Sequence, residues 1–183
     1  MTSVLIASDI HGSAYYAEAL MARIEAASPD RIVLLGDLLY HGPRNDLPRD
    51  YAPKAVIPML NSLRSRLLCV RGNCDGEVDQ MVLDFPIMAD YAWLSLSGRD
   101  VLATHGHHFG EMTPPPLPEG GILLNGHTHV PAWTEHPGFL YLNPGSVAIP
   151  KAGSCHSYMM WENDTFTWRD VMTGEIYHTL TLG

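Results

Sequence analysis

The chain has 183 residues, 46% of them hydrophobic and 17% charged, which is enough for one sizeable core and excludes a disordered chain or a coiled coil. Its 20 acidic residues outnumber 11 basic ones, so the formal net charge is −9. Proteins that hold nucleic acids gather Lys and Arg against the phosphates, and this balance therefore argues against stable nucleic-acid binding.

The first residues, MTSVLIASDIHG, contain a short apolar run, no preceding positive charge and an aspartate at position 9. This pattern is typical of neither a signal peptide nor a membrane span, so we expect no membrane association. The three cysteines, Cys69, Cys74 and Cys155, follow no disulfide or metal-ligand spacing. A reducing cytoplasm is therefore the expected location.

Short aliphatic runs that stop at a small or polar residue recur along the chain, at 4–7, 32–35, 67–70, 101–104 and 122–124. Apolar runs without alternation predict strands that are buried on both faces. Helical spacing predicts helices at 13–27, 52–66 and 77–83. Ser13 is the expected N-cap of the first helix, and Pro58 implies a kink or a late start in the second. The alternation predicts an α/β fold with a parallel sheet.

Beyond residue 90 the helical patterns stop, and turn residues separate runs that we interpret as strands, at 91–96, 158–161, 166–168 and 176–180. We expect these strands to form a second, largely antiparallel sheet that packs face to face on the first. Two loops rich in Pro and Gly, 41–53 and 114–121, are longer than plain connections and are expected to wall a cleft. Because no linker or repeat interrupts the chain, we predict a single domain over residues 1–183.

Polar residues follow the aliphatic runs, at the strand ends where open α/β sheets bind ligands. These residues are Asp9, His11, Asp37, Asn73, His105, His127 and His129. Asp9 and His11 are two residues apart, so an extended backbone would place both side chains on one face. His127 and His129 have the same spacing, and a glycine adjoins each of the other three, which allows a tight turn there.

This donor set favours a metal centre. Carboxylate, amide and imidazole groups without thiolate suit Mn, Fe, Zn, Co or Ni. Seven side chains are too many for one open catalytic ion but suit two ions about 3.5–4 Å apart that share a bridging carboxylate. Taken singly, an Asp or a Gly-Asn after a strand is commonly a turn, and the stretch NGHTHV at 125–130 fits a surface turn equally well. The arrival of all five motifs at strand ends favours the metal centre over separate turns.

The ordered motifs D-x-H (9–11), GD (36–37), GN (72–73), H (105) and GHxH (126–129), on a β-α-β frame, resemble the calcineurin-like metallophosphoesterase family. HGPRN (41–45), RGNCD (71–75) and LNPGSV (142–147) resemble its small bacterial YfcE-type phosphodiesterase branch. The motifs span about two-thirds of the chain. The resemblance implies a four-layer α-β-β-α sandwich of two mixed sheets with helices outside.

The resemblance also implies two divalent metal ions, with manganese as the expected metal. By the family's roles, one ion is held by Asp9, His11 and His129, the other by Asn73, His105 and His127, and Asp37 bridges the two. The implied activity is hydrolysis of small phosphodiesters. The ions would lower the pKa of a bridging water toward neutrality, so that a metal-bound hydroxide attacks in line with the leaving group.

Cys74 departs from the family pattern, since many members carry histidine after this asparagine. An uncharged thiol does not attract an anion as an imidazolium does, and no residue nearby in the sequence activates it as a nucleophile. We interpret Cys74 as a small buried side chain that fills the place of the imidazole. Two divalent ions, two carboxylates and one hydroxide leave one formal positive charge, which a phosphodiester monoanion balances and a monoester dianion exceeds. We therefore predict diesterase over monoesterase activity.

The remaining candidates are less specific. Arg44 and Asn45 are expected to contact phosphate, with a solvated loop charge as the alternative for Arg44. His107 is expected beside the metal ligands or facing the substrate. Asp75 is expected to anchor its own turn or a ligand histidine. Residues 143–146 are most simply a turn, with a position near the site as the alternative.

The expected partner is a small phosphorylated substrate, and the family resemblance adds a homodimer or homotetramer. Three alternative functions stay open: a phosphomonoesterase, a nuclease of the same family, and a non-catalytic scaffold like the phosphoesterase-like subunit of retromer. The missing basic surface weighs against the nuclease. The scaffold subunit has lost metal ligands, whereas this chain keeps the full set.

Overall fold

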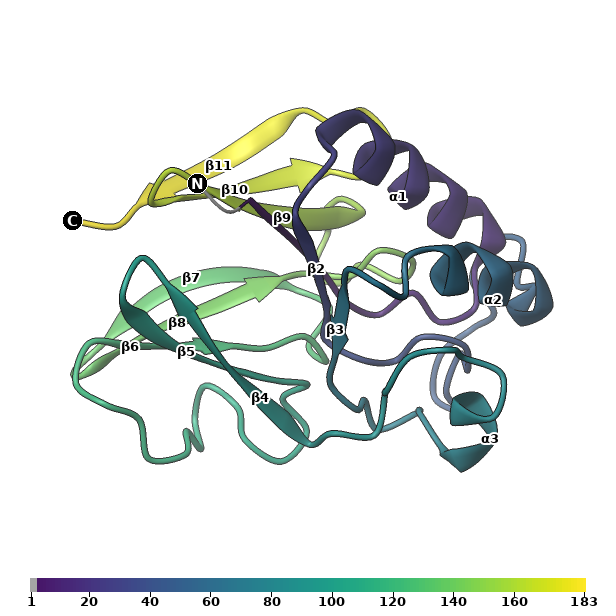
Figure 1. Cartoon of the computed structure of the whole chain (residues 1–183). Helices are drawn as coiled ribbons and strands as arrows, with labels where there is room; N and C mark the ends of the chain where they lie inside the picture. Colours follow the sequence, from purple (N-terminus) through teal and green to yellow (C-terminus); the bar gives the residue numbers. More distant parts are fainter. Residues whose placement is uncertain (1–2) are drawn as a thin grey trace.

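The computed structural model describes residues 3–183, which form two β-sheets and three helices (Figure 1). The helices are α1 (Ala14–Ala27), α2 (Pro53–Ser62) and α3 (Glu77–Gln80). The first sheet contains β1 (Val4–Ala7), β2 (Arg31–Leu34), β3 (Leu67–Cys69), β9 (Ser157–Glu162), β10 (Thr165–Asp170) and β11 (Ile176–Thr181). The second sheet contains β4 (Tyr91–Leu96), β5 (Arg99–Thr104), β6 (Gly121–Leu124), β7 (Pro131–His136) and β8 (Phe139–Pro144). Over the described part of the chain, every helix is too short or too polar to cross a membrane.

The strand order of the first sheet is β11-β10-β9-β1-β2-β3. Strands β1, β2 and β3 are parallel, with α1 and α2 as the crossovers, which confirms the predicted β-α-β plan. Strand β9 pairs antiparallel with the second edge of β1, and β10 and β11 extend the sheet, each antiparallel to the strand before it. The prediction that 158–161, 166–168 and 176–180 belong to the second sheet is wrong, because β9 hydrogen-bonds to the edge of β1 that β2 leaves open.

The second sheet has the order β4-β5-β6-β8-β7. Strands β5, β6 and β8 are parallel to one another, whereas β4 and β7 are antiparallel to their neighbours. The sheet is therefore mixed, as the family resemblance implied, and the prediction of a largely antiparallel sheet is wrong. The hairpin of β7 and β8 had no sequence prediction, because β7 is only partly buried and lacks a clear apolar alternation.

The two sheets pack face to face over a common core. In β1, Leu5 and Ala7 pack toward the helices, whereas Val4 and Ile6 pack toward the second sheet. Both faces of β1 are buried, which confirms the inference from its unbroken apolar run. Trp168 of β10 is fully buried in the layer between the sheets.

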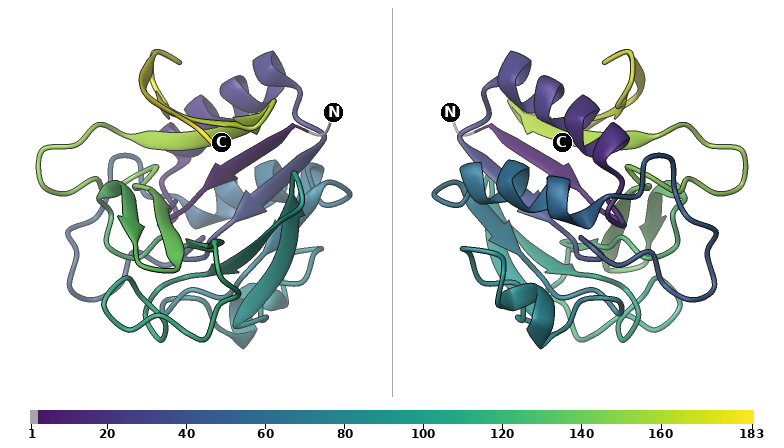
Figure 2. Two further views of the ribbon diagram at one scale, coloured as in Figure 1. Left: turned by 90° about the vertical axis from the view of Figure 1, so that its left-hand side faces the viewer. Right: turned by 90° about the vertical axis from the view of Figure 1, so that its right-hand side faces the viewer.

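Helices α1 and α2 cover the outer face of the first sheet (Figure 1), and Figure 2 shows the same layers from two sides. The outer face of the second sheet carries Leu102, Leu123 and Tyr141. Leu117, from the loop between β5 and β6, packs on them, so within residues 3–183 the fourth layer is a loop instead of a helix. The predicted sandwich of two mixed sheets is confirmed, with helices on the outer face of the first sheet and a loop in place of the predicted helices on the second.

The helix ends agree in part with their sequence signals. The Ser13 hydroxyl accepts a hydrogen bond from the Tyr16 N–H (3.3 Å), which confirms the predicted N-cap. Helix α2 begins at Pro53 and contains Pro58, so the alternative of a late start is wrong. Proline at the first helical position suits a helix start because its missing N–H has no partner there.

Candidate metal centre

The polar residues predicted at the strand ends lie together. Asp9 and His11 follow β1, Asp37 follows β2, Asn73 follows β3, His105 follows β5, and His127 and His129 follow β6. The loops of the two sheets contact one another here, because the His127 N–H donates to Asp9 Oδ2 (3.1 Å). The Gly126 N–H in turn donates to the carbonyl of His105 (2.9 Å). The site is thus built by both sheets.

The backbone at the site is left-handed at five of the seven predicted metal-site residues. The φ angles are 59° at Asp9, 47° at His11, 56° at Asp37, 64° at His127 and 61° at His129. Side chains other than glycine disfavour this region, at a cost of about 1–3 kcal/mol each, and such strain concentrates at functional sites. The backbone is therefore not extended at Asp9, His11, His127 or His129, so the condition for a shared face does not hold. The turn at 9–11 nevertheless brings His11 Nε2 within 3.6 Å of Asp9 Oδ1.

Two glycines allow these turns to approach the carboxylates. A Cβ atom on Gly126 would lie 2.9 Å from Asp9 Oδ2 and would overlap the Ser8 hydroxyl. A Cβ atom on Gly72 would overlap Asp37 Oδ1. Any side chain at either glycine would therefore displace a carboxylate of the site.

Three histidine rings are held in one orientation by backbone carbonyls. The Nδ1 atoms donate to the carbonyls of Tyr40 (His11, 2.8 Å), Leu35 (His105, 2.6 Å) and Ile149 (His129, 2.6 Å). A carbonyl only accepts, so each Nδ1 carries a proton, and Nε2 is the ring nitrogen that faces the Asp9 and Asp37 carboxylates. This is the arrangement by which proteins orient histidine ligands of metal ions.

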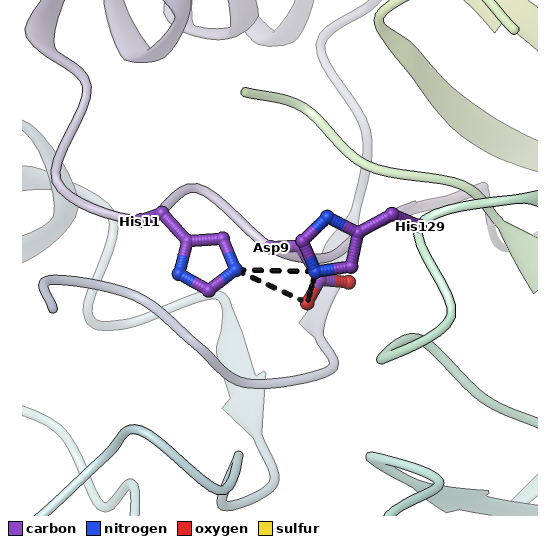
Figure 3. A group of neighbouring side chains, drawn as sticks. All are labelled: Asp9, His11 and His129. Atoms are coloured by element: carbon purple, nitrogen blue, oxygen red, sulfur yellow. Dashed lines mark hydrogen bonds and ion pairs between the residues drawn. The ribbon is translucent and has the colours of Figure 1, made fainter. Parts of the chain in front are cut away.

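The first group of side chains is Asp9, His11 and His129, whose ligand atoms form a triangle (Figure 3). His11 Nε2 lies 3.3 Å from His129 Nε2, and Asp9 Oδ1 lies 3.6 Å and 3.2 Å from these two atoms. Asp9 Oδ1 is buried and has no hydrogen-bond partner among the described residues. Ligand atoms this close together repel one another unless a proton or a metal cation lies between them. Burial would lower the pKa of His11, but Asp9 raises it accordingly.

The second group surrounds Asp37. Ligand atoms of Asp9, Asp37 and His105 lie within 4.8 Å of one another. His105 Nε2 is 3.4 Å from Asp37 Oδ2 and 3.1 Å from Asn73 Oδ1. Asp37 Oδ2 also lies 3.7 Å from His11 Nε2, so the Asp37 carboxylate reaches toward both groups.

His127 lies at the margin of this cluster. Its ring centroid is 5.0 Å from that of His105, and its side chain is half-buried. Burial and the neighbouring His105 lower the pKa of His127, which favours a neutral ring with a free lone pair.

The electrostatics of the cluster reflect opposite charges at short range. Burial would raise the pKa of Asp9, but the His11 and His129 rings hold it well below its usual range. Burial would lower the pKa of His105, but Asp37 and Asp9 raise it to about 9. The carboxylates are therefore ionised and attract positive charge into a buried site.

The donor set fits divalent metal ions. Two buried carboxylates, one amide oxygen and imidazole nitrogens of fixed orientation are ligands of intermediate hardness, which suit Mn, Fe, Zn, Co and Ni. The unpartnered Asp9 Oδ1 and the facing Nε2 atoms of His11 and His129 are the features that a bound cation explains.

Asp75 supports the cluster from behind. Its Oδ2 accepts hydrogen bonds from the N–H groups of Asp37 and Gly72, both at 2.8 Å, and its Oδ1 accepts from the Leu38 N–H (2.9 Å). The buried carboxylate thereby joins the loop that carries Asp37 to the loop that carries Asn73. The structure thus places Asp75 at the backbone of a predicted ligand and not at a histidine.

Cys74 lines the cleft beside Asp37 and is half-buried, so the prediction of a small buried side chain in the place of the imidazole is only partly confirmed. Its N–H donates to Asp37 Oδ1 (2.8 Å), and its Sγ accepts from the Asn73 amide (3.2 Å). Burial and the nearby Asp37 and Asp75 carboxylates raise the pKa of the thiol to about 12. A neutral thiol agrees with the prediction that Cys74 is not an activated nucleophile.

A cleft of about 450 Å³ opens over the cluster. Its lining residues are Asp37, Gly42, Pro43, Arg44, Asn45, Asn73, Cys74, His127, Thr128, His129 and Lys151. Arg44 and Asn45, the predicted substrate residues, therefore lie in the wall of the cleft, which confirms the prediction for the loop at 41–53. The same prediction is wrong for the loop at 114–121, which does not line this cleft and whose Leu117 packs on the second sheet. His107 lies beside His105 (ring centroids 5.4 Å apart), outside this set of lining residues. Burial and the neighbouring His105 lower the pKa of His107 to about 4.

Two residues that act on the site lack a local sequence signal. Lys151 lines the cleft although it lies more than twenty residues beyond the GHxH motif. The Ser146 hydroxyl donates to the Asp9 carbonyl (3.0 Å) and accepts from the Ile149 N–H (2.9 Å). Because the Ile149 carbonyl holds His129, the segment at 143–146 lies near the site, as the alternative for this segment predicted, and supports it.

Comparisons with known proteins agree with this geometry. The sequence profile of the calcineurin-like phosphoesterase superfamily domain matches residues 2–165. The chain is 43% identical over 167 residues to phosphodiesterase YfcE of Escherichia coli strain K12, with 91% of each chain covered. It is 29% identical over 185 residues to the probable metallophosphoesterase YsnB of Bacillus subtilis strain 168, covering 91% of this chain and 89% of YsnB.

Comparison with solved structures shows that the fold is similar as well as the sequence. The structure of YfcE, a phosphoesterase from E. coli, superimposes with a TM-score of 0.95 at 40% identity, covering 99% of this chain and 100% of YfcE. Vps29 from Entamoeba histolytica, complexed with Zn²⁺, has a TM-score of 0.61 at 16% identity over 97% of this chain and 98% of Vps29, a likeness of fold alone. The match of family profile, sequence and structure over nearly the whole chain shows that this protein belongs to the calcineurin-like phosphoesterase family and is a homologue of phosphodiesterase YfcE.

Proposed function

We propose that this protein is a dinuclear metal-dependent phosphodiesterase that hydrolyses small phosphodiesters. The observation that carries the proposal is the buried convergence of histidine Nε2 atoms, each fixed through Nδ1, on the carboxylates of Asp9 and Asp37. The 43% identity to a protein named phosphodiesterase supports the diesterase reading over other activities.

We assign the metal ligands as the family resemblance implies. One ion would be held by Asp9, His11 and His129, the other by Asn73, His105 and His127, with Asp37 between them. The triangle of Asp9, His11 and His129 supports the first set. The contacts of His105 with Asp37 and Asn73 support the second.

Bound divalent ions would supply an activated water molecule and positive charge for the phosphoryl oxygens. The residues of the chain hold the geometry. The carbonyls of Tyr40, Leu35 and Ile149 keep three imidazoles in ligand orientation, and Asp75 fixes the backbone of Asp37. No protein nucleophile is required, which agrees with a Cys74 thiol that stays protonated.

We infer a preference for diesters over monoesters from the neutral Cys74. The position that carries a histidine in many relatives offers no positive charge here to a phosphomonoester dianion. A diester carries one negative charge and needs less compensation. Arg44 and Asn45 in the cleft wall would contact the phosphoryl oxygens or the ester groups. His107, beside His105, would support that ligand from outside the cleft lining.

Manganese is our proposed native metal, with Fe, Zn, Co or Ni as the alternatives that the same donor set accepts.

Three cysteines without a disulfide support a cytoplasmic location. The core shared by the two sheets supports a single domain over residues 1–183. We also infer a homodimer or homotetramer, which the exposed Tyr91 and Trp93 on the edge strand β4 support. The net charge of −9 argues against stable nucleic-acid binding.

The test is to strip the protein with a chelator, restore Mn²⁺, and assay paired aryl phosphodiester and phosphomonoester substrates. Hydrolysis of the diester that depends on added metal supports the proposal. Monoester turnover that equals or exceeds diester turnover would show a phosphomonoesterase and remove the argument from Cys74. Absence of turnover on either substrate with Mn, Fe, Zn, Co and Ni would favour the non-catalytic scaffold.

A further inference from the structure

Two cationic side chains line the cleft in addition to the groups of the metal cluster. Lys151 lies in the loop between β8 and β9, and Arg44 lies in the loop between β2 and α2. Both side chains are exposed. The chain has only two lysines and carries a net charge of −9, so a lysine beside the metal cluster is a specific feature of this acidic protein.

The backbone of Lys151 is held against the metal cluster. Its N–H donates to the carbonyl of His129 (3.1 Å). Its own carbonyl accepts from the N–H (3.1 Å) and the hydroxyl (2.7 Å) of Ser154. The Lys151 side chain therefore starts from a fixed point next to a predicted metal ligand and lines the cleft, which its four-carbon stem allows the ammonium group to reach.

The backbone near Arg44 is held by a second set of contacts. The Asn45 amide donates to the His41 carbonyl (2.9 Å), which closes the loop on itself. A Cβ atom on Gly42 would lie 3.0 Å from Cys74 Sγ, so this loop packs directly on the thiol. Arg44 and Lys151 thus enter the cleft from two different loops, one at Cys74 and the other at His129.

Neither cation forms an ion pair within the described part of the chain. Over residues 3–183, no carboxylate lies within ion-pair distance of Lys151 or Arg44, whereas the nearby Arg49 lies 3.9 Å from Asp50. The carboxylate in the lining, Asp37, belongs to the metal cluster. The charge that the cleft presents away from that cluster is therefore positive and uncompensated.

We infer that Lys151, together with Arg44, recognises a second anionic group on the substrate, so that the preferred substrates are phosphodiesters whose alcohol arm carries a carboxylate or a phosphate. Because this rests on the proposed diesterase activity, the scissile phosphodiester occupies the metal cluster and the second anion lies along the wall. A volume of about 450 Å³ holds an alcohol arm in addition to the phosphoryl group.

The kinetic test uses two aryl phosphodiesters of nearly equal size, para-nitrophenyl carboxypropyl phosphate and its carboxamide counterpart. We expect the parent enzyme to favour the carboxylate about fivefold in kcat/KM, the effect of one partly exposed ion pair. In Lys151→Gln the ratio should fall to about one. Lys54→Gln, which changes the other lysine at an exposed position of α2, should keep the parent ratio.

A binding measurement separates recognition from turnover. Dialkyl phosphinates keep the single negative charge of a diester, and their P–C bonds resist hydrolysis. Calorimetry should show that the phosphinate with a carboxypropyl arm binds the parent protein about fivefold more tightly than its carboxamide counterpart. The difference should disappear in Lys151→Gln and shrink in Arg44→Gln.

An equal loss on both substrates in Lys151→Gln would place the ammonium group on the scissile phosphate and overturn the inference. A parent enzyme that hydrolyses both diesters at equal kcat/KM would also overturn it, while leaving the diesterase activity intact. Absence of hydrolysis of either diester by the metal-loaded parent would instead refute the proposed function, and the inference with it.

Discussion

The substitution Asp75→Asn tests how the loop that carries Asp37 is held to the loop that carries Asn73. Asp75 is 3% exposed and accepts three backbone hydrogen bonds, from Asp37, Gly72 and Leu38. Asparagine has the same shape but only one acceptor oxygen. In the variant, the side-chain oxygen of the asparagine can accept the hydrogen bonds from the Asp37 and Gly72 N–H groups. Its NH₂ group then takes the place of Oδ1 and faces the Leu38 N–H, so that two donors oppose each other.

A buried N–H without an acceptor costs about 1–3 kcal/mol, and the loss of charge assistance in the other two bonds adds about 1 kcal/mol. A partial gain opposes this loss, because burial raises the pKa of Asp75 and a neutral amide is easier to bury. We therefore expect Asp75→Asn to lower the free energy of unfolding by about 2 kcal/mol. Affinity for the metal near Asp37 should fall about tenfold, a typical effect of losing support behind a ligand.

Urea denaturation followed by circular dichroism measures the first quantity, and calorimetric titration of the stripped protein with Mn²⁺ measures the second. Asp79→Asn is the matched control, because Asp79 accepts one backbone N–H, that of Gly76 (2.8 Å), at the start of α3. It should cost no more than about 1 kcal/mol and leave metal affinity unchanged. If Asp75→Asn unfolds like the parent and binds metal equally well, the Asp75 carboxylate does not hold the two loops together.

Three further predictions concern the cluster itself. Gly126→Ala places a methyl group against Ser8 and Asp9, so we expect a loss of about 2 kcal/mol of unfolding free energy in urea and weaker Mn²⁺ binding; parent-like values for both would refute the close packing. His105→Ala should reduce the bound metal from two ions to one, measured by elemental analysis after equilibrium dialysis, and retention of two ions would remove His105 from the ligand set. Cys74→His restores a cationic side chain beside Asp37 and should raise monoester relative to diester turnover about tenfold; an unchanged ratio would contradict the charge argument.

The sequence predicted the first half of the fold more completely than the second. Unbroken apolar runs identify β1 and β2 because these strands are buried between the helices and the second sheet. The short apolar run of β3 identifies this strand as well, although Leu67 and Leu68 are only partly buried. The sheet membership of β9, β10 and β11 depends on a pairing between β1 and β9, more than one hundred and fifty residues apart in the chain. No local pattern distinguishes a strand that joins the first sheet from one that joins the second, so this part of the prediction was wrong.

In the candidate site, too, some features follow from the local sequence and others depend on long-range contacts. The order of Asp, His and Asn motifs after the aliphatic runs is a property of the sequence, and it sufficed to name the family and the seven residues that the structure gathers. The reason is that parallel strands bring their carboxyl ends to one edge, whatever the details of each turn.

Only the tertiary structure decided how these side chains meet. The left-handed turns at Asp9 and His129, the three N–H groups around Asp75 and the position of Lys151 all arise from contacts between loops of different strands. Such contacts join residues that are distant in the chain, and the local sequence does not encode their geometry. The sequence by itself therefore determined which chemical groups the protein has and at which strand ends they lie, whereas the packing of the two sheets determined how they are oriented.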